Sequence, residues 1–253
     1  MRKLIILGLV LLAPCLWGQT LGEYVVQGKE KIASAVSSWD KDKMLSARAH
    51  FERVLALGEK EWLLNYYIAY CDYRLATYAL SEEDKKSTMG FINDGLARLK
   101  RSIQQNSEFA ESYALMSSLY GLKINLRPWA GFLYGPRSGR YLATALALGP
   151  SNPRVHYIQG MSSFHTPERF GGGKKKAKSV LEEAIMLFSS EDVSPLMPDW
   201  GYSEAYGWLG LCELDLGDTT SAKLHFDKAL DIDPENNWVK YRLLPGLDSN
   251  ESP

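Results

Sequence analysis

The sequence predicts an all-α protein in which about five helical hairpins stack into a right-handed α-solenoid with a C-terminal capping helix. Two observations predict this fold class. A stripe of small and large apolar residues recurs five times along the chain, and each recurrence follows another stretch with helical apolar periodicity. The chain has 253 residues and 45% hydrophobic content, so it is long enough to bury a sizeable core.

The first 19 residues have the pattern of a secretory signal peptide. A short basic segment (residues 1–3) precedes an apolar run (residues 4–16) that is too short for a stable membrane span. Gly18 supplies the small residue expected before a cleavage site, so we expect the mature chain to begin near residue 19 or 20. The expected location is the periplasm or the exterior, and an uncleaved N-terminal anchor is the alternative.

The three cysteines give no support for lipidation, a disulfide or a metal site. Pro14 stands directly before Cys15, where lipid attachment requires a small residue other than proline, so lipoprotein anchoring is not expected. Cys71 and Cys212 lie in apolar helical stretches several repeats apart. We expect them to be buried free thiols that bind no metal.

The nearly neutral overall charge gives no support for a nucleic-acid partner. Basic side chains number 29 and acidic ones 30, so the chain lacks the positive charge typical of nucleic-acid-binding proteins. Once the signal peptide is removed, an integral membrane protein is not expected either. Recognition must therefore depend on local chemistry.

The repeated stripe places a small residue, a large apolar residue four positions later, and two more residues seven and eight positions later on one helix face. A neighbouring helix can approach the small residue closely. Because one amphipathic helix pair cannot bury all its apolar surface, successive pairs are expected to stack. The five stripes are Ala47/Phe51/Val54/Leu55, Gly95/Leu99/Ser102/Ile103, Ser138/Leu142/Ala145/Leu146, Ala177/Leu181/Ala184/Ile185 and Ala222/Phe226/Ala229/Leu230.

The last full unit, residues 203–236, resembles the tetratricopeptide repeat (TPR) family in its 34-residue length and in its residue pattern. Earlier units are longer and match more loosely. The residues that carry the resemblance are Ala205, Tyr206, Leu209, Gly210, Gly217, Asp218, Ala222, Phe226, Ala229, Leu230, Asp233 and Pro234. The predicted units are 20–57, 60–105, 107–149, 152–190 and 203–236, followed by a cap at 237–245 and a frayed tail at 248–253.

The resemblance implies that partners bind the concave wall formed by the first helix of each pair. Tyrosines there offer rigid contact area and arginines can hold a carboxylate, which suits a protein segment, a peptide or an organic acid. The alternative is that the tyrosines only pack between helices. The predicted wall residues are Tyr66, Tyr70, Tyr73, Arg74, Arg154, Tyr157, Met161 and His165.

Two insertions interrupt the units. The first, residues 166–173, ends in three glycines and is followed by lysines, which suits either a shaped loop or a lip on the groove. The predicted lip is Phe170, Gly171, Gly172, Gly173 and Lys174. The second insertion, residues 126–135, contains Pro128, Trp129, Phe132 and Tyr134, and would form an apolar patch if exposed.

These extensions also resemble, at the turn of residues 170–173, the T component of bacterial TRAP transporter systems (TatT), an exported TPR-like protein that associates with a solute-binding partner. This resemblance leaves two functions open. The first is an exported scaffold or adaptor that binds a protein or peptide in its groove without catalysis. The alternative is a periplasmic component of a transport system that binds a small ligand in a closed apolar cavity.

No arrangement of residues predicts catalysis, a cofactor or a metal. His156 and His165 are nine residues apart, which places them on different sides of one helix. His50 and His225 each precede a phenylalanine of the stripe, and we expect them to be exposed or capped. The chain is therefore predicted not to be an enzyme.

Overall fold

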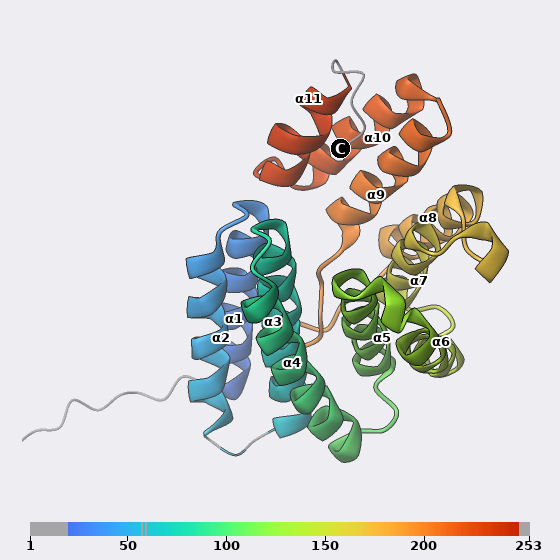
Figure 1. Ribbon diagram of the computed structural model, residues 1–253. Helices are drawn as coiled ribbons and strands as arrows, with labels where there is room; N and C mark the ends of the chain where they lie inside the picture. The colour runs from blue at the N-terminus through green and yellow to red at the C-terminus, as the bar shows by residue number, and fades with distance from the viewer. Residues whose placement is uncertain (1–19, 57, 59, 248–253) are drawn as a thin grey trace, which may run out of the picture.

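The computed structural model describes residues 20–56, 58 and 60–247, in which there is no β-strand. Ten long helices of this described part form five antiparallel pairs in chain order (Figure 1). The pairs are α1 (Leu21–Ser37) with α2 (Lys41–Leu55), α3 (Glu61–Ser81) with α4 (Lys85–Gln105), α5 (Ala110–Leu126) with α6 (Gly131–Leu148), α7 (Pro153–His165) with α8 (Lys174–Ser189), and α9 (Tyr202–Asp215) with α10 (Thr219–Ile232). The predicted all-α solenoid is confirmed. The predicted signal peptide and the tail after residue 247 lie outside the described residues.

Four shorter elements complete the described chain. Single 3-10 turns, η1 (Pro128–Ala130) and η2 (Glu168–Phe170), lie within the two insertions. After α10 follow a π-helical turn, η3 (Val239–Leu243), and a short helix, α11 (Leu244–Gly246). Val239 and Leu243 are buried against the fifth pair, so these two elements close the C-terminal end of its core.

Polar residues set the starts of several helices. The Thr20 side chain accepts a hydrogen bond from the backbone N–H of Glu23, and the Glu23 side chain accepts one from the backbone N–H of Thr20. Other helix starts use one aspartate or asparagine each to satisfy a free backbone N–H. These capping residues are Asp40, Asp84, Asn152 and Asp218.

Close approach of paired helices depends on glycines that face large residues of the stripe. A β-carbon at Gly28 would lie 2.3 Å from Cζ of Phe51, and one at Gly210 would lie 2.4 Å from Cε1 of Phe226. Gly160 faces Leu181 in the same way, at 2.6 Å from its Cγ. In the first, fourth and fifth pairs, the repeated stripe of the sequence thus supplies contacts within the pair. The third pair departs from this pattern, because only Ala145 of α6 is buried.

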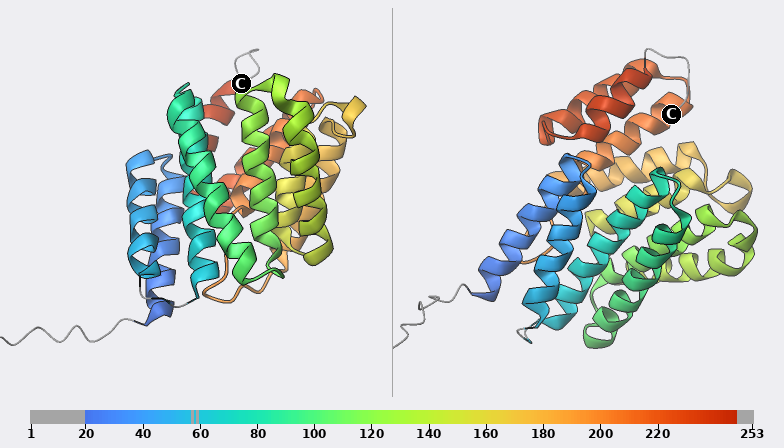
Figure 2. Two further views of the ribbon diagram at one scale, coloured as in Figure 1. Left: turned by 60° about the horizontal axis from the view of Figure 1, so that its bottom comes forward. Right: turned by 60° about the vertical axis from the view of Figure 1, so that its left-hand side comes forward.

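The fifth pair folds back onto the first two pairs. Residues 190–201, which join α8 to α9 and which we call the strap, run along the inner sides of α3 and α5 (Figure 1). Oγ of Ser37 donates to Oδ2 of Asp233 at 2.6 Å, and Nδ2 of Asn237 donates to the carbonyl of Ser38 at 3.1 Å. Figure 2 shows α9 to α11 lying across one end of α1 to α3. The concave side of the solenoid is therefore covered by its own chain.

Candidate functional site

The structure brings most of the predicted wall residues together but leaves them little exposed. Seven of the eight are buried, with exposed fractions of 0% for Tyr66 and Tyr70 and 2% for Arg154. His165 differs, because it lies at the exposed end of α7. The predicted wall thus exists as a cluster inside the molecule. Partner binding by these residues stays a prediction, since an open groove is not what the described structure presents.

Trp200 of the strap covers the tyrosines of α3. Its ring stacks on Tyr70 with 4.5 Å between ring centroids and meets Tyr157 edge-on at 6.0 Å. Its Nε1 donates a hydrogen bond to the Tyr66 hydroxyl at 3.0 Å. The neighbouring Tyr67 hydroxyl donates to the carbonyl oxygen of Leu196 at 2.7 Å. The strap therefore fills the place where the sequence predicts a partner.

Lys29 of α1 holds the segment of the strap that precedes Trp200. Its Nζ donates to the carbonyl oxygens of Pro195 at 2.9 Å and Met197 at 2.7 Å. The same nitrogen pairs with Oδ2 of Asp199 at 2.9 Å. Three oxygens of one short segment thus surround a single ammonium group whose side chain is only 10% exposed.

The arginines of the wall already form ion pairs with acidic residues of the same chain. Nε of Arg154 lies 2.8 Å from Oε1 of Glu111, and its Nη2 also pairs with Glu191 of the strap. Oε2 of Glu111 in turn accepts from the Tyr66 hydroxyl at 2.8 Å. Burial, with a further contribution from Glu111, raises the pKa of Tyr66 well above its usual value, so this hydroxyl stays a hydrogen-bond donor.

Two buried polar atoms of the wall have no partner within the described residues. They are the hydroxyl of Tyr70 and Nε of Arg74. Arg74 is otherwise paired through Nη1 with Glu204 of α9 at 2.9 Å. Burial raises the pKa of Tyr70 well above its usual value, which keeps the unpartnered hydroxyl neutral.

The predicted lip forms a compact turn. The backbone N–H of Gly173 donates to the carbonyl of Ser163 at 2.9 Å, and a β-carbon at Gly172 would lie 2.1 Å from the carbonyl oxygen of Thr166. Lys174 pairs with Asp215 at 2.7 Å instead of remaining free for an anion. Phe170 extends from this turn with 71% of its surface exposed.

The second insertion exposes a larger apolar group. Trp129 is 71% exposed and Phe132 is 78% exposed, beside the partly exposed Leu133. The same stretch of the chain carries four cationic side chains, and none of their charged groups forms an ion pair or a hydrogen bond in the described part of the chain. We call this set the aromatic-basic surface: Lys123, Arg127, Trp129, Phe132, Leu133, Arg137 and Arg140. In the left view of Figure 2, the turns containing η1 and η2 lie along the same edge of the solenoid.

The charge of the aromatic-basic surface follows from the sequence. No aspartate or glutamate occurs between Glu111 and Glu168, so nothing nearby in the chain neutralises these cations. Burial, followed by the charges of Arg137 and Arg127, lowers the pKa of Lys123. The ammonium of Lys123 lies 5.5 Å from the centre of the Tyr134 ring and 5.9 Å from that of Tyr120. Sequence reasoning identified the aromatic residues here but missed the absence of acids, which was open to inspection.

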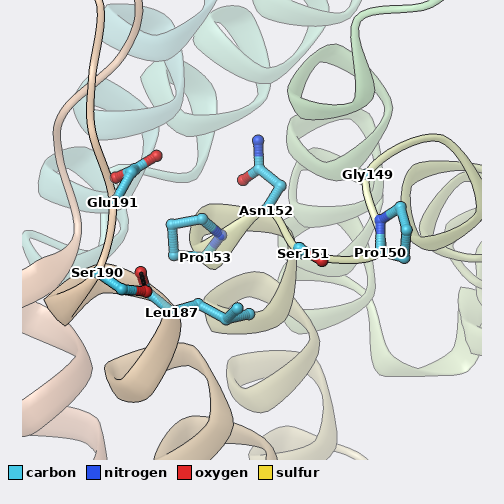
Figure 3. Close-up of a pocket in the computed structure, with 8 residues that line it drawn as sticks. All are labelled: Gly149, Pro150, Ser151, Asn152, Pro153, Leu187, Ser190 and Glu191. Atoms are coloured by element: carbon cyan, nitrogen blue, oxygen red, sulfur yellow. Dashed lines mark hydrogen bonds between the residues drawn. The ribbon is translucent and has the colours of Figure 1, made fainter.

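Two open hollows lie on the described surface. The larger, about 540 Å³, lies between the start of α7 and the end of α8 and is lined by Gly149, Pro150, Ser151, Asn152, Pro153, Leu187, Ser190 and Glu191 (Figure 3). Its main polar side chains are already engaged, because Asn152 caps α7 and Glu191 pairs with Arg154. The smaller, about 240 Å³, lies between α2 and α4 beside Arg48 and Arg98, both already paired with acids. Neither is the closed apolar cavity that the small-ligand alternative predicts.

The histidines and cysteines form no cluster among the described residues. No group of three or more His, Cys, Asp or Glu side chains is placed there to hold a metal ion. Nε2 of His156 lies 2.8 Å from the carbonyl oxygen of Pro150, and Nε2 of His50 lies 2.8 Å from that of Tyr24. His50 is therefore buried and capped by a backbone carbonyl. Cys71 and Cys212 are buried free thiols.

No helix of the described chain has both the length and the apolar character needed to cross a bilayer.

Comparison with known proteins bears on what such a solenoid does. Residues 203–236 match the tetratricopeptide repeat family, and this unit is the last of five successive helix pairs in the described chain. The chain is a tetratricopeptide repeat protein.

Several TPR proteins and related structures are similar to this TPR chain. The HusA haemophore from Porphyromonas gingivalis is 28% identical, with a TM-score of 0.67, over 78% of this chain and 95% of that one. A thermophilic TPR protein of Thermus thermophilus shares the fold at 19% identity, with a TM-score of 0.60, over 90% of this chain and 99% of that one. The Hsp70-Hsp90 organizing protein of Triticum aestivum is 27% identical over 113 residues, which are 45% of this chain. The match spans only 17% of the length of that curated relative. The resemblance to TatT stays a prediction.

Proposed function

We propose that this chain is an exported carrier that binds a planar apolar ligand with carboxylate groups, of the porphyrin class, on the aromatic-basic surface. The observation that carries this proposal is the exposure of Trp129 and Phe132 in a segment that carries four unpaired cations and no acids. Large exposed apolar groups on a soluble domain commonly mark a binding surface.

The chemistry of the surface suits such a ligand in two ways. Exposed aromatic rings offer faces on which a planar ring system can stack. The guanidinium groups of Arg127, Arg137 and Arg140 can each hold a carboxylate through two parallel hydrogen bonds. The similarity to HusA, over 95% of that chain, supports the proposal because HusA is a haemophore. In this reading the ligand is cargo on an open surface, not the occupant of a closed cavity.

The test is a titration of the purified chain with haemin and, separately, with metal-free protoporphyrin, followed by Soret absorbance and tryptophan fluorescence. We expect the double variant Trp129→Ala, Phe132→Ala to bind at least tenfold more weakly, which corresponds to about 1.4 kcal/mol. Arg137→Gln with Arg140→Gln should weaken binding of the carboxylated ligand but not of its dimethyl ester. Binding of both porphyrins would show that iron ligation is not required.

Matched controls separate this surface from general apolar binding. Met186 is 65% exposed on α8 and Leu224 is 57% exposed on α10. Their double alanine variant also removes two exposed apolar side chains, but from another part of the surface. If it weakens porphyrin binding as much as the Trp129 and Phe132 variant does, the ligand does not sit on the aromatic-basic surface and the proposal is wrong.

A second candidate function is an adaptor that binds a protein or peptide segment in the concave groove. The TPR match at residues 203–236 and the organizing-protein relative favour it. A partner would have to replace the strap over the wall tyrosines. Crosslinked capture from an envelope extract tests this: a partner lost with Tyr73→Ala, at the rim of the wall, and kept with the exposed Tyr241→Ala would support the groove. Equal capture by both variants would contradict it.

Export is part of both proposals. The basic and apolar pattern of residues 1–19 supports a cleaved signal peptide. Fractionation of cells that express the full chain, with sequencing of the mature N-terminus, should recover a periplasmic or secreted protein that begins near residue 19 or 20. Recovery in the cytosol with Met1 retained would contradict export, and a membrane-bound chain with residues 1–19 intact would indicate the anchor instead.

A further inference from the structure

The strap lies on the solenoid in the manner of a bound peptide. Side chains of α1 and α3 beside the wall donate to its backbone carbonyls: Lys29 to Pro195 and Met197, and Tyr67 to Leu196. In the described chain the strap's backbone N–H groups make only local hydrogen bonds, such as Met197 to the carbonyl of Ser194 at 2.9 Å. Main-chain contacts of this kind hold an extended segment, while side-chain contacts select its sequence.

Three features of the strap supply that selection. Leu196 and Met197 pack against the apolar core of the first three helix pairs. Asp199 pairs with Lys29 at 2.9 Å. The Trp200 ring lies against Tyr70, and its Nε1 reaches the Tyr66 hydroxyl. A proline precedes the apolar pair and another follows it, so the recognised pattern is Pro-Leu-Met-Pro-Asp-Trp.

The strap is only partly buried, in contrast to the wall it covers. Ser194, Pro195 and Asp199 are exposed, while Tyr66 and Tyr70 have exposed fractions of 0%. Leaving the wall would cost the strap apolar contacts, side-chain hydrogen bonds and its ion pairs with Lys29 and Arg154, but no helix. Departure of Trp200 would uncover Tyr66 and Tyr70, and the hydroxyl of Tyr70 lacks a partner among the described residues.

We propose that the wall is a peptide-binding site occupied in cis by the strap, and that its ligand in a partner protein is an extended segment with a proline-flanked apolar pair followed by an acid and a tryptophan. This inference rests on the adaptor function and adds the chemistry of its ligand. Because the strap is tethered, its effective concentration at the wall is high, and a free segment competes poorly until the strap is weakened.

The test uses a fluorescent synthetic peptide with the sequence of residues 194–201 and measures anisotropy on titration with the full chain. We expect the variant Leu196→Ser, Met197→Ser, Trp200→Ala, which keeps the linker length, to bind the peptide at least tenfold more tightly than the unmodified chain. Changing the peptide's aspartate to lysine, or its tryptophan to alanine, should weaken binding at least tenfold. Adding Lys29→Ala to the triple variant should likewise weaken its binding of the unchanged peptide at least tenfold.

A variant that keeps the helical circular dichroism of the unmodified chain yet binds the peptide no better would overturn the proposal. If the triple variant does not fold, Met197→Ser alone is used, and hydrogen exchange of the strap amides is measured with and without peptide. Faster strap exchange with the cognate peptide than with a scrambled one supports the proposal, and equal exchange contradicts it. Capture of an envelope partner is measured separately, so a partner that binds in a Tyr73-dependent way without any peptide binding would leave the adaptor function standing and reject only this ligand chemistry.

Discussion

Nη1 of Arg74 lies 2.9 Å from Oε1 of Glu204, so one ion pair joins α3 to α9 across 130 residues of sequence. Both side chains are about 10% exposed. A buried pair of this kind fixes the position of the fifth helix pair against the second, and its loss would leave one charge without compensation.

Glu204→Ala should therefore lower the free energy of unfolding by about 3–5 kcal/mol, because Arg74 stays buried and charged. Denaturant unfolding followed by circular dichroism measures this. The exposed pair of Lys223 and Asp227, joined at 2.7 Å, provides the control, and Asp227→Ala should change the stability by less than about 1 kcal/mol. Equal costs for the two variants would mean that the Arg74 pair does not hold the fifth helix pair in place.

Gly172 in the turn between α7 and α8 should not tolerate alanine. Its β-carbon would lie 2.1 Å from the carbonyl oxygen of Thr166, which is part of the backbone and cannot move away easily. Gly172→Ala should lower the melting temperature and cost more than about 1 kcal/mol. Gly139→Ala on α6, where nothing lies within 4 Å, should instead stabilise the helix by about 0.5–1 kcal/mol. A neutral Gly172→Ala would show that the turn rearranges freely.

Asp72 should make stability depend on pH. Burial raises the pKa of Asp72 to about 7, although Arg48, with its Nε at 2.6 Å, opposes this shift. Because the folded state binds the proton more tightly than the unfolded one, the group stabilises the fold fully below pH 4, and this contribution is lost as pH rises to about 7. The free energy of unfolding of the unmodified chain, minus that of Asp72→Asn, should thus fall by about 2–3 kcal/mol between pH 5 and pH 7. If this difference in free energy of unfolding is the same at pH 5 and pH 7, the pKa of Asp72 is not raised. The control is Asp227→Asn at an exposed position, which should show the same pH dependence of stability as the unmodified chain.

The two cysteines of the described chain should be unreactive while the protein is folded. Burial raises the pKa of the Cys71 thiol well above its usual value and that of Cys212 to about 12. In a Cys15→Ser chain, a thiol reagent at pH 8 should label neither site in native buffer and both in denaturant, because the thiolate is the reactive form. Rapid labelling of either thiol in the folded chain would be inconsistent with this packing.

The helix pairs were predictable because periodicity is a local property. Ala177, Leu181 and Ala184 are all buried, as their spacing on one stripe requires. The stripe residues of the first and fifth pairs behave alike, including Phe51 and Phe226. The stripe of α6 is less deeply buried: Ala145 is fully buried, whereas Leu142 and Leu146 are only half-buried against the core.

The state of the concave wall was not predictable from the same pattern. Periodicity assigns Tyr70 and Arg74 to a face of their own helix, but whether that face is open depends on Trp200 and Glu204, which lie more than 100 residues later. One indication was present in the sequence. The strap contains Leu196, Met197 and Trp200 between and after prolines, and a loop with that much apolar surface needs something to cover.

The contacts of Ser37 with Asp233 and of Ser38 with Asn237 join residues 196 and 199 positions apart. An open repeat array unfolds from its ends, one unit at a time, because each unit touches only its neighbours. Here the first and last helix pairs are joined by hydrogen bonds, so each terminal pair contacts more than its neighbour in the repeat array. Unfolding therefore cannot begin at an uncontacted terminal pair. The molecule should therefore unfold in one step instead of fraying, and its folding should wait for long-range closure until the C-terminal pair has been synthesised.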